Sequence, residues 1–232
     1  MMFDFAHSQQ LLVVLTDSWP AVQARLYCLE KKGSAWRPAL GPFSAVVGSN
    51  GMAWGVGFPD NKQSGPVKKE GDRKAPAGVF RLVKAMGYAR TAPEGSTFPY
   101  EQIRESSLCV DDPASEQYNR ILDTDDPAKP VTSTWKSAEV MKRKDDLYKW
   151  LVIVDYNREQ PEPGAGSCIF IHVWRSKDEG TAGCTAIAER NILELLLWLK
   201  PERNPLLVQM PGQEYELRWY AWSLPSPELL RR

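Results

Sequence analysis

The sequence has no excess of charge of either sign and no long hydrophobic run. Its 232 residues carry 29 Lys and Arg against 29 Asp and Glu, so the net charge is zero when His is neutral. This balance removes the electrostatic reason to expect a nucleic-acid partner or an anionic membrane surface. Leu11–Leu15, the longest apolar run near the start, is far shorter than the roughly 20 residues of a membrane helix, so we expect no transmembrane segment. Met1–Gln10 also lacks the basic start and apolar middle of a signal peptide.

Histidine and cysteine are scarce, which limits metal and disulfide chemistry. The chain contains two histidines and four cysteines: His7, His172, Cys28, Cys109, Cys168 and Cys184. No two cysteines form a C-x-x-C pair, whereas structural zinc usually needs four ligands at such short paired spacings. We therefore expect no metal site, and a zinc-stabilised β domain remains as one alternative. The chain also lacks the G-x-S-x-G elbow of serine hydrolases.

Short apolar runs separated by turn residues predict a mainly β fold. Sixteen Gly and 18 Pro, together with nine Trp and eight Tyr, favour strands and structured loops over a helical bundle. The predicted strands are Leu11–Thr16, Gln23–Glu30, Phe43–Val47, Val79–Val83, Leu151–Tyr156, Cys168–Trp174, Leu206–Met210 and Tyr215–Trp222. A helix is expected over Asn191–Lys200, and one or two helical turns over Ser137–Lys149. We expect a single domain over residues 1–232, a β-sandwich or barrel with a few short helices.

One strand and the loop after it bring a histidine close in sequence to a cysteine. His172 lies inside the predicted strand Cys168–Trp174, and the polar loop Arg175–Cys184 follows. A reactive thiol needs a nearby base and backbone N–H groups that face the developing oxyanion, and Gly183 permits a tight backbone there. Cys168 is a poor rival, because four strand residues separate it from His172 by roughly 13 Å. The pattern indicates a Cys/His enzyme, with a satisfied core histidine as the alternative.

The same residues resemble a known family. Ser167–Ile187 is similar to the signature of L,D-transpeptidase (YkuD-type) catalytic domains, in which a strand histidine is followed by a loop and a [Ser/Thr]-x-Gly-Cys motif. Gly71–Phe80 resembles the "GD-x-[RK]-[TA]-P-x-G-x-[FY]" segment of one branch of that family. The resemblance is strongest over residues 11–210. It implies an L,D-transpeptidase-like β-sandwich or barrel.

The resemblance also implies roles for individual residues. Cys184 would be the nucleophile and His172 the base that activates it. Thr181 stands at the Ser/Thr position of the motif, and the backbone N–H groups of Gly183 and Cys184 would form the oxyanion hole. Family members cleave peptidoglycan stem peptides after the third residue through a thioester, and they pass the acyl group to an amine or to water. No cofactor is implied. Carbapenems would acylate the same sulfur, and the location would be periplasmic or in the cell envelope.

Several finer expectations follow from these residues. Arg73 is a candidate to hold a stem-peptide carboxylate, with a solvated loop as the alternative, and Trp174 is a second candidate for substrate contact. A cysteine beside a histidine usually has a lowered pKa, so Cys184 should be the most reactive thiol. At most one disulfide can form among the other three cysteines. Many family members carry an Arg shortly after the cysteine, where this chain has Thr185–Ile187. This leaves an L,D-carboxypeptidase and a catalytically silent wall-binding domain as alternatives.

Overall fold

The computed structural model of the protein describes residues 7–56, 65–126 and 134–231. Most strands belong to one 10-stranded sheet with the order β10-β11-β12-β3-β2-β1-β13-β5-β4, and β6 pairs with β5. These strands are β1 (Gln10–Thr16), β2 (Gln23–Lys32), β3 (Ala35–Val46), β4 (Met52–Trp54), β5 (Ala75–Gly87), β6 (Tyr100–Gln102), β10 (Trp150–Val154), β11 (Phe170–Val173), β12 (Thr185–Ile187) and β13 (Leu206–Pro211). The expected mainly β architecture is confirmed.

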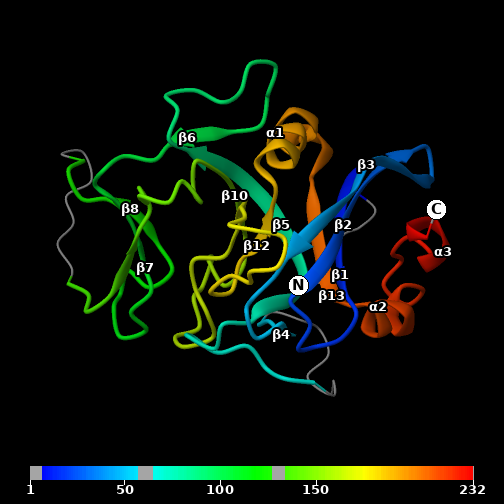
Figure 1. The fold of residues 1–232 in the computed structure, drawn as a ribbon, viewed down its shortest axis with the longest axis horizontal. Helices are drawn as coiled ribbons and strands as arrows, with labels where there is room; N and C mark the ends of the chain where they lie inside the picture. Colours follow the sequence, from blue (N-terminus) through cyan, green and yellow to red (C-terminus); the bar gives the residue numbers. More distant parts are fainter. Residues whose placement is uncertain (1–6, 57–64, 127–133, 232) are drawn as a thin grey trace.

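Strand β5 closes the large sheet into a barrel-like assembly. Its first half pairs with β13, and its second half pairs with β10, which lies at the other end of the strand order. The peptide that joins Arg81 to Leu82 marks the change, because the Arg81 carbonyl accepts the Asp155 N–H while the Leu82 N–H donates to Pro205. The two groups of one peptide point to opposite edges of a strand, so β13 and β10 lie on opposite sides of β5. Figure 1 shows β5 crossing the centre of the molecule.

A second, three-stranded sheet lies beside the barrel. It has the order β8-β7-β9, with β7 at Ser107–Val110, β8 at Ile121–Asp123 and β9 at Ala138–Val140. Figure 1 shows this small sheet in green at one side of the molecule and the C-terminal helices in red at the other. The helices are α1 (Glu189–Trp198), the 3-10 turn η1 (Pro201–Arg203), α2 (Gly212–Arg218) and α3 (Pro227–Leu230). Cys109 of β7 packs in one buried cluster with residues of β10 and β11, so the small sheet neighbours these two strands.

The strands that the sequence predicts from continuous apolar runs lie in the core of the barrel, where most of their side chains are buried. Residues 11–14 of β1 are fully buried, as are residues 207 and 208 of the parallel neighbour β13. Helix α1 buries Ile192, Leu195 and Leu196 along one face, as the helical spacing predicts. In the part of the chain that the structure describes, no helix is long and apolar enough to cross a membrane.

Two predictions of secondary structure are wrong. Ser137–Lys149 forms β9 followed by turns instead of helical turns, because residues 138–140 pair with β7 and Asp146 adopts a left-handed φ of 56°. Tyr215–Trp222 is not a closing strand, since α2 covers its first half. The ion pair of Glu214 with Arg218 joins residues four apart, as on a helix, while Tyr215 is buried against the core.

Candidate active site

Strands β11 and β12 bring His172 and Cys184 to the same face of the sheet. The two strands are parallel neighbours, with His172 opposite Ala186. Cys184 lies just before β12 and packs in one buried cluster with Phe170, which shares a face of β11 with His172. The Phe170 N–H donates to the Cys184 sulfur at 3.3 Å, which fixes the cysteine beside the start of β11. His172 on β11 and Cys184 in the turn that leads into β12 therefore belong to the same face of the sheet.

The His172 ring is buried and held in one tautomer. Its Nδ1 lies 2.8 Å from the carbonyl oxygen of Val173, which can only accept, so Nδ1 carries the proton and Nε2 keeps the lone pair. The residue is 4% exposed, and burial lowers the pKa of His172 to about 4. The imidazole is consequently neutral at pH 7, in the form that can accept a proton.

The Cys184 thiol is also buried, and its pKa differs from the sequence expectation. Its sulfur accepts from Phe170 and donates to the carbonyl oxygen of Cys168 at 3.4 Å. Burial raises the pKa of Cys184 to about 12, and the charge of Glu139 adds to this shift. The expected lowering of the pKa is wrong for this resting structure, because desolvation disfavours the thiolate. Both members of the pair are neutral before substrate arrives.

Thr181 organises the backbone just before the cysteine. Its hydroxyl accepts the N–H of Gly183 at 3.0 Å and donates to the carbonyl oxygen of Cys184 at 2.7 Å. Gly183 has a φ of 155°, and a Cβ there would lie 3.2 Å from the carbonyl oxygen of Lys74. The Gly183 N–H, one of the two expected oxyanion donors, is therefore engaged by Thr181.

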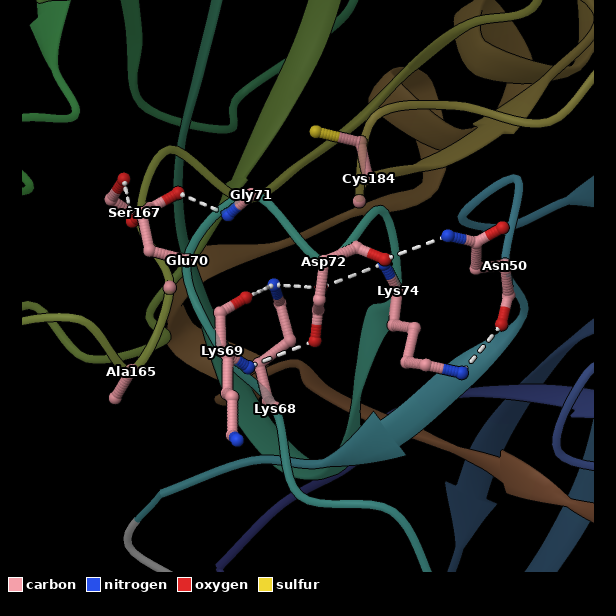
Figure 2. Close-up of polar contacts among 12 residues, drawn as sticks. Asn50, Lys68, Lys69, Glu70, Gly71, Asp72, Lys74, Ala165, Ser167 and Cys184 are labelled. Carbon is pink, nitrogen blue, oxygen red and sulfur yellow. Dashed lines mark hydrogen bonds and ion pairs between the residues drawn. The ribbon is translucent and has the colours of Figure 1, made fainter.

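The segment Lys68–Lys74 forms the surroundings of this turn, and Figure 2 shows it beside Cys184. The buried Lys68 ammonium contacts the Asp72 carboxylate and the Lys69 carbonyl oxygen, both at 2.6 Å. Glu70 accepts the Ser167 hydroxyl at 2.7 Å, which ties the segment to the residues just before β11. The positive charge of Lys68 acts to lower the pKa of Cys184, against the larger effect of burial.

The two candidate substrate contacts lie at the edges of this arrangement. Arg73 is exposed and has a φ of 57°, while its carbonyl oxygen accepts the N–H of Asn50 at 2.9 Å. Within the described residues its guanidinium makes no hydrogen bond or ion pair, so the charge is available to a ligand. Trp174 is half-buried just after β11, where its backbone N–H donates to the Ile187 carbonyl oxygen at 2.9 Å.

The sequence did not indicate which residues support Cys184 through its hydrogen bond to Cys168. Cys109 on β7 and Cys168 form a disulfide, and Asn119 accepts the Cys168 N–H at 2.9 Å. The sequence allowed one disulfide among three cysteines, but the partners follow from how the small sheet docks. Cys28 and Cys184 are free thiols. In residues 7–56, 65–126 and 134–231, no group of three or more His, Cys, Asp or Glu side chains could hold a metal ion.

The comparison with protein-family models agrees with this geometry. The family model described as the L,D-transpeptidase catalytic domain, YkuD, matches residues 20–208. The crystal structure of the helical cell shape determining protein Pgp2 from Campylobacter jejuni is similar at 15% sequence identity and a TM-score of 0.36. That match covers 90% of this chain and 52% of the Pgp2 chain, so this chain spans about half of that length. A search of curated proteins finds no match.

Proposed function

Because the chain belongs to the YkuD family of L,D-transpeptidase catalytic domains, we propose that it is a cysteine acyltransferase that acts on peptidoglycan stem peptides. The observation that carries this proposal is the pairing of β11 with β12, which supports a catalytic pair of His172 and Cys184 on one face of the sheet. The proposed catalytic unit is a single domain that needs no cofactor.

The neutral resting state supports a proton transfer that accompanies attack. The Cys184 proton moves to Nε2 of His172 while the sulfur attacks the carbonyl carbon of the third stem residue. The carbonyl oxygen becomes an oxyanion that the Cys184 N–H can stabilise. As the oxyanion collapses, the peptide C–N bond breaks, and His172 returns the proton to the leaving amine. The product is a thioester between the stem peptide and Cys184.

The second half of the reaction regenerates the thiol. An acceptor amine attacks the thioester carbonyl while His172 takes one of its protons, and that proton then returns to the sulfur. An amine acceptor gives transpeptidation, whereas water gives an L,D-carboxypeptidase by the same steps. A catalytically silent wall-binding domain is the remaining alternative, and it predicts no thioester at all.

Arg73 is the proposed contact for a carboxylate of the stem peptide. Its exposed guanidinium lies one residue before Lys74, and the Lys74 carbonyl oxygen contacts the turn at Gly183. Trp174, at the end of the strand that carries His172, is the second proposed contact. Replacement of Arg73 by Ala should raise KM and leave kcat nearly unchanged, and unchanged values of both would remove Arg73 from the site.

The disulfide supports a location in the cell envelope. Disulfides persist in oxidising compartments such as the periplasm and are rare in the cytosol. A buried Cys109–Cys168 bond beside a free Cys184 therefore fits a protein that works outside the cytoplasm. Carbapenems are expected to acylate Cys184, because they present an activated carbonyl to the same sulfur.

The test is product analysis with defined tetrapeptide muropeptides. Wild-type protein should shorten the stems to tripeptides or join them to an acceptor amine, as mass spectrometry would detect. Cys184→Ala should abolish both products, while Cys28→Ala, which removes the other free thiol, should retain them. Unchanged stems with folded wild-type protein would contradict the proposal.

A further inference from the structure

Tyr148 is a buried aromatic residue that contacts the His172 ring directly. The two rings meet edge to face, with centroids 5.1 Å apart and planes at 74°. Tyr148 also packs edge to face on Phe170, at 5.5 Å, on the same strand as His172. The residue is 5% exposed, so this contact is part of the packed interior. The Tyr148 ring thus forms one side of the space in which the imidazole can turn.

A carboxylate and a guanidinium hold Tyr148 in place. The Tyr148 hydroxyl donates to Oε1 of Glu139 at 2.6 Å, and Arg143 contacts the same carboxylate oxygen at 3.4 Å. The Arg143 guanidinium also lies 5.2 Å from the centre of the Tyr148 ring. Arg143 is fixed in turn by Asp145, with two hydrogen bonds of 2.8 and 2.7 Å.

These charged side chains are also connected to β11, the strand that carries His172. Arg175, two residues after β11, donates to Asp145 at 2.9 Å. The Val173 N–H donates to the Leu147 carbonyl oxygen at 3.1 Å, so the residue before Tyr148 is tied to the residue after His172. The segment 139–148 therefore clamps the end of β11 through backbone, ring and charge contacts.

We propose that Tyr148, held by Glu139, is a positioning residue that keeps the His172 ring in the orientation and tautomer needed to accept the Cys184 proton. The imidazole is anchored by the hydrogen bond of Nδ1 to its own neighbour, Val173, and the backbone of Leu147, the residue before Tyr148, also acts on it by hydrogen bonding. Such backbone hydrogen bonds hold the ring only as long as packing prevents it from swinging about its outer torsion. The Tyr148 ring supplies that packing. This inference rests on the proposed function of His172 as the base.

The electrostatic surroundings agree with a positioning role and not with acid catalysis by the tyrosine. Burial raises the pKa of Tyr148 well above its usual value, and the charge of Glu139 acts in the same direction. The hydroxyl therefore keeps its proton and donates a hydrogen bond to Glu139. The charged groups that act on His172 itself are Arg143, which lowers its pKa, and Asp145, which raises it.

The experiment separates ring orientation from turnover. In a His7→Gln background, His172 is the only histidine, so its two ring nitrogens can be followed by nitrogen-15 NMR at pH 7. Tyr148→Leu should give mixed tautomers and lower kcat by about tenfold to a hundredfold at nearly constant KM, as expected for a misplaced catalytic group. Glu139→Ala should lower kcat severalfold, and Glu139→Gln, which keeps an acceptor oxygen, should restore it.

Tyr215 provides the matched control. It is a fully buried tyrosine whose hydroxyl donates to the backbone carbonyl of Pro225 at 2.8 Å, and it packs in the core of the barrel, with β1 and β13. Tyr215→Leu should leave the His172 tautomer and kcat unchanged in folded protein. A single Nδ1–H tautomer in folded Tyr148→Leu would overturn the proposal. If Tyr148→Leu does not fold, an unchanged kcat in Glu139→Ala would overturn it instead. The tautomer is measured without substrate, so its outcome does not depend on whether stem peptides are turned over.

Discussion

The Cys184 thiol donates to the carbonyl oxygen of Cys168, and Cys168 is bound by a disulfide to Cys109 on β7. The free cysteine is therefore supported by a residue that the small sheet holds in place. Cys168 has a left-handed φ of 55°, a conformation that needs support from its surroundings. The disulfide and the hydrogen bond from its N–H to Asn119 supply that support.

Loss of the disulfide should weaken both the fold and the site. The double variant Cys109→Ala/Cys168→Ala should lower the free energy of unfolding by about 2–4 kcal/mol, because the bond closes a long loop in the unfolded chain. Urea unfolding would measure this, with Cys28→Ala as a control for the loss of a buried thiol. Thiol titration of the oxidised protein in denaturant should count two free thiols, Cys28 and Cys184. Four free thiols would contradict the pairing.

The buried histidine should make the protein less stable in mild acid. The pKa of His172 is about 4 in the folded protein against 6.5 in its ordinary state, so the unfolded chain binds a proton at a higher pH. The stabilisation is complete above pH 6.5 and is lost as the pH falls toward 4, which amounts to roughly 3 kcal/mol. His172→Gln should flatten this part of the stability curve. Parallel curves for the two proteins would show that His172 is not buried neutral.

The reactivity of Cys184 should follow its raised pKa. Since burial raises the pKa to about 12, the rate of alkylation by iodoacetamide should keep rising beyond pH 9 instead of levelling off near neutrality. Glu139→Gln should increase the rate at a given pH, because the Glu139 charge contributes to the shift. Mass spectrometry of the labelled peptide would follow both. A plateau below pH 7 would mean that a thiolate–imidazolium pair forms at rest.

The Thr181 hydroxyl should matter more than its methyl group. Thr181→Val removes the two hydrogen bonds that shape the turn at Gly183 and Cys184, while Thr181→Ser keeps them. We expect kcat to fall by about tenfold or more in the valine variant, since small displacements of reacting groups are costly. The serine variant should stay within a few-fold of wild type. Equal activity of the two variants would exclude the hydroxyl as an organiser of the turn.

The sequence carried the parts of the fold that depend on local pattern. Leu11–Thr16 and Leu206–Met210 are continuous apolar runs and form neighbouring buried strands. The strand that carries His172 was predicted as well, whereas the short strand β12 after Cys184 was not. Contacts made by distant segments were not predictable in this way. The partner of Cys168 lies 59 residues away, and its choice depends on how the small sheet docks.

The raised pKa of Cys184 likewise depends on contacts between segments that are distant in the sequence. A nearby histidine predicts a lowered pKa, but the amount of water around the sulfur is decided by Tyr148, Phe170 and the other residues that pack over it. Tyr148 lies in the segment Ser137–Lys149, whose composition predicted helical turns and gave no indication of a contact with His172. Its Asp146 turn and its pairing with β7 are set by tertiary contacts, which override local propensity.

The most direct test of the proposed function is to trap the thioester on Cys184. Wild-type protein should be mixed with a defined tetrapeptide stem in the absence of an acceptor amine, quenched in acid and analysed by peptide mass mapping. The account predicts a tripeptidyl acyl group on the peptide that contains Thr181–Cys184, release of the fourth residue, and no adduct in Cys184→Ala. Release of the fourth residue with no adduct on Cys184, and with undiminished release by Cys184→Ala, would contradict it.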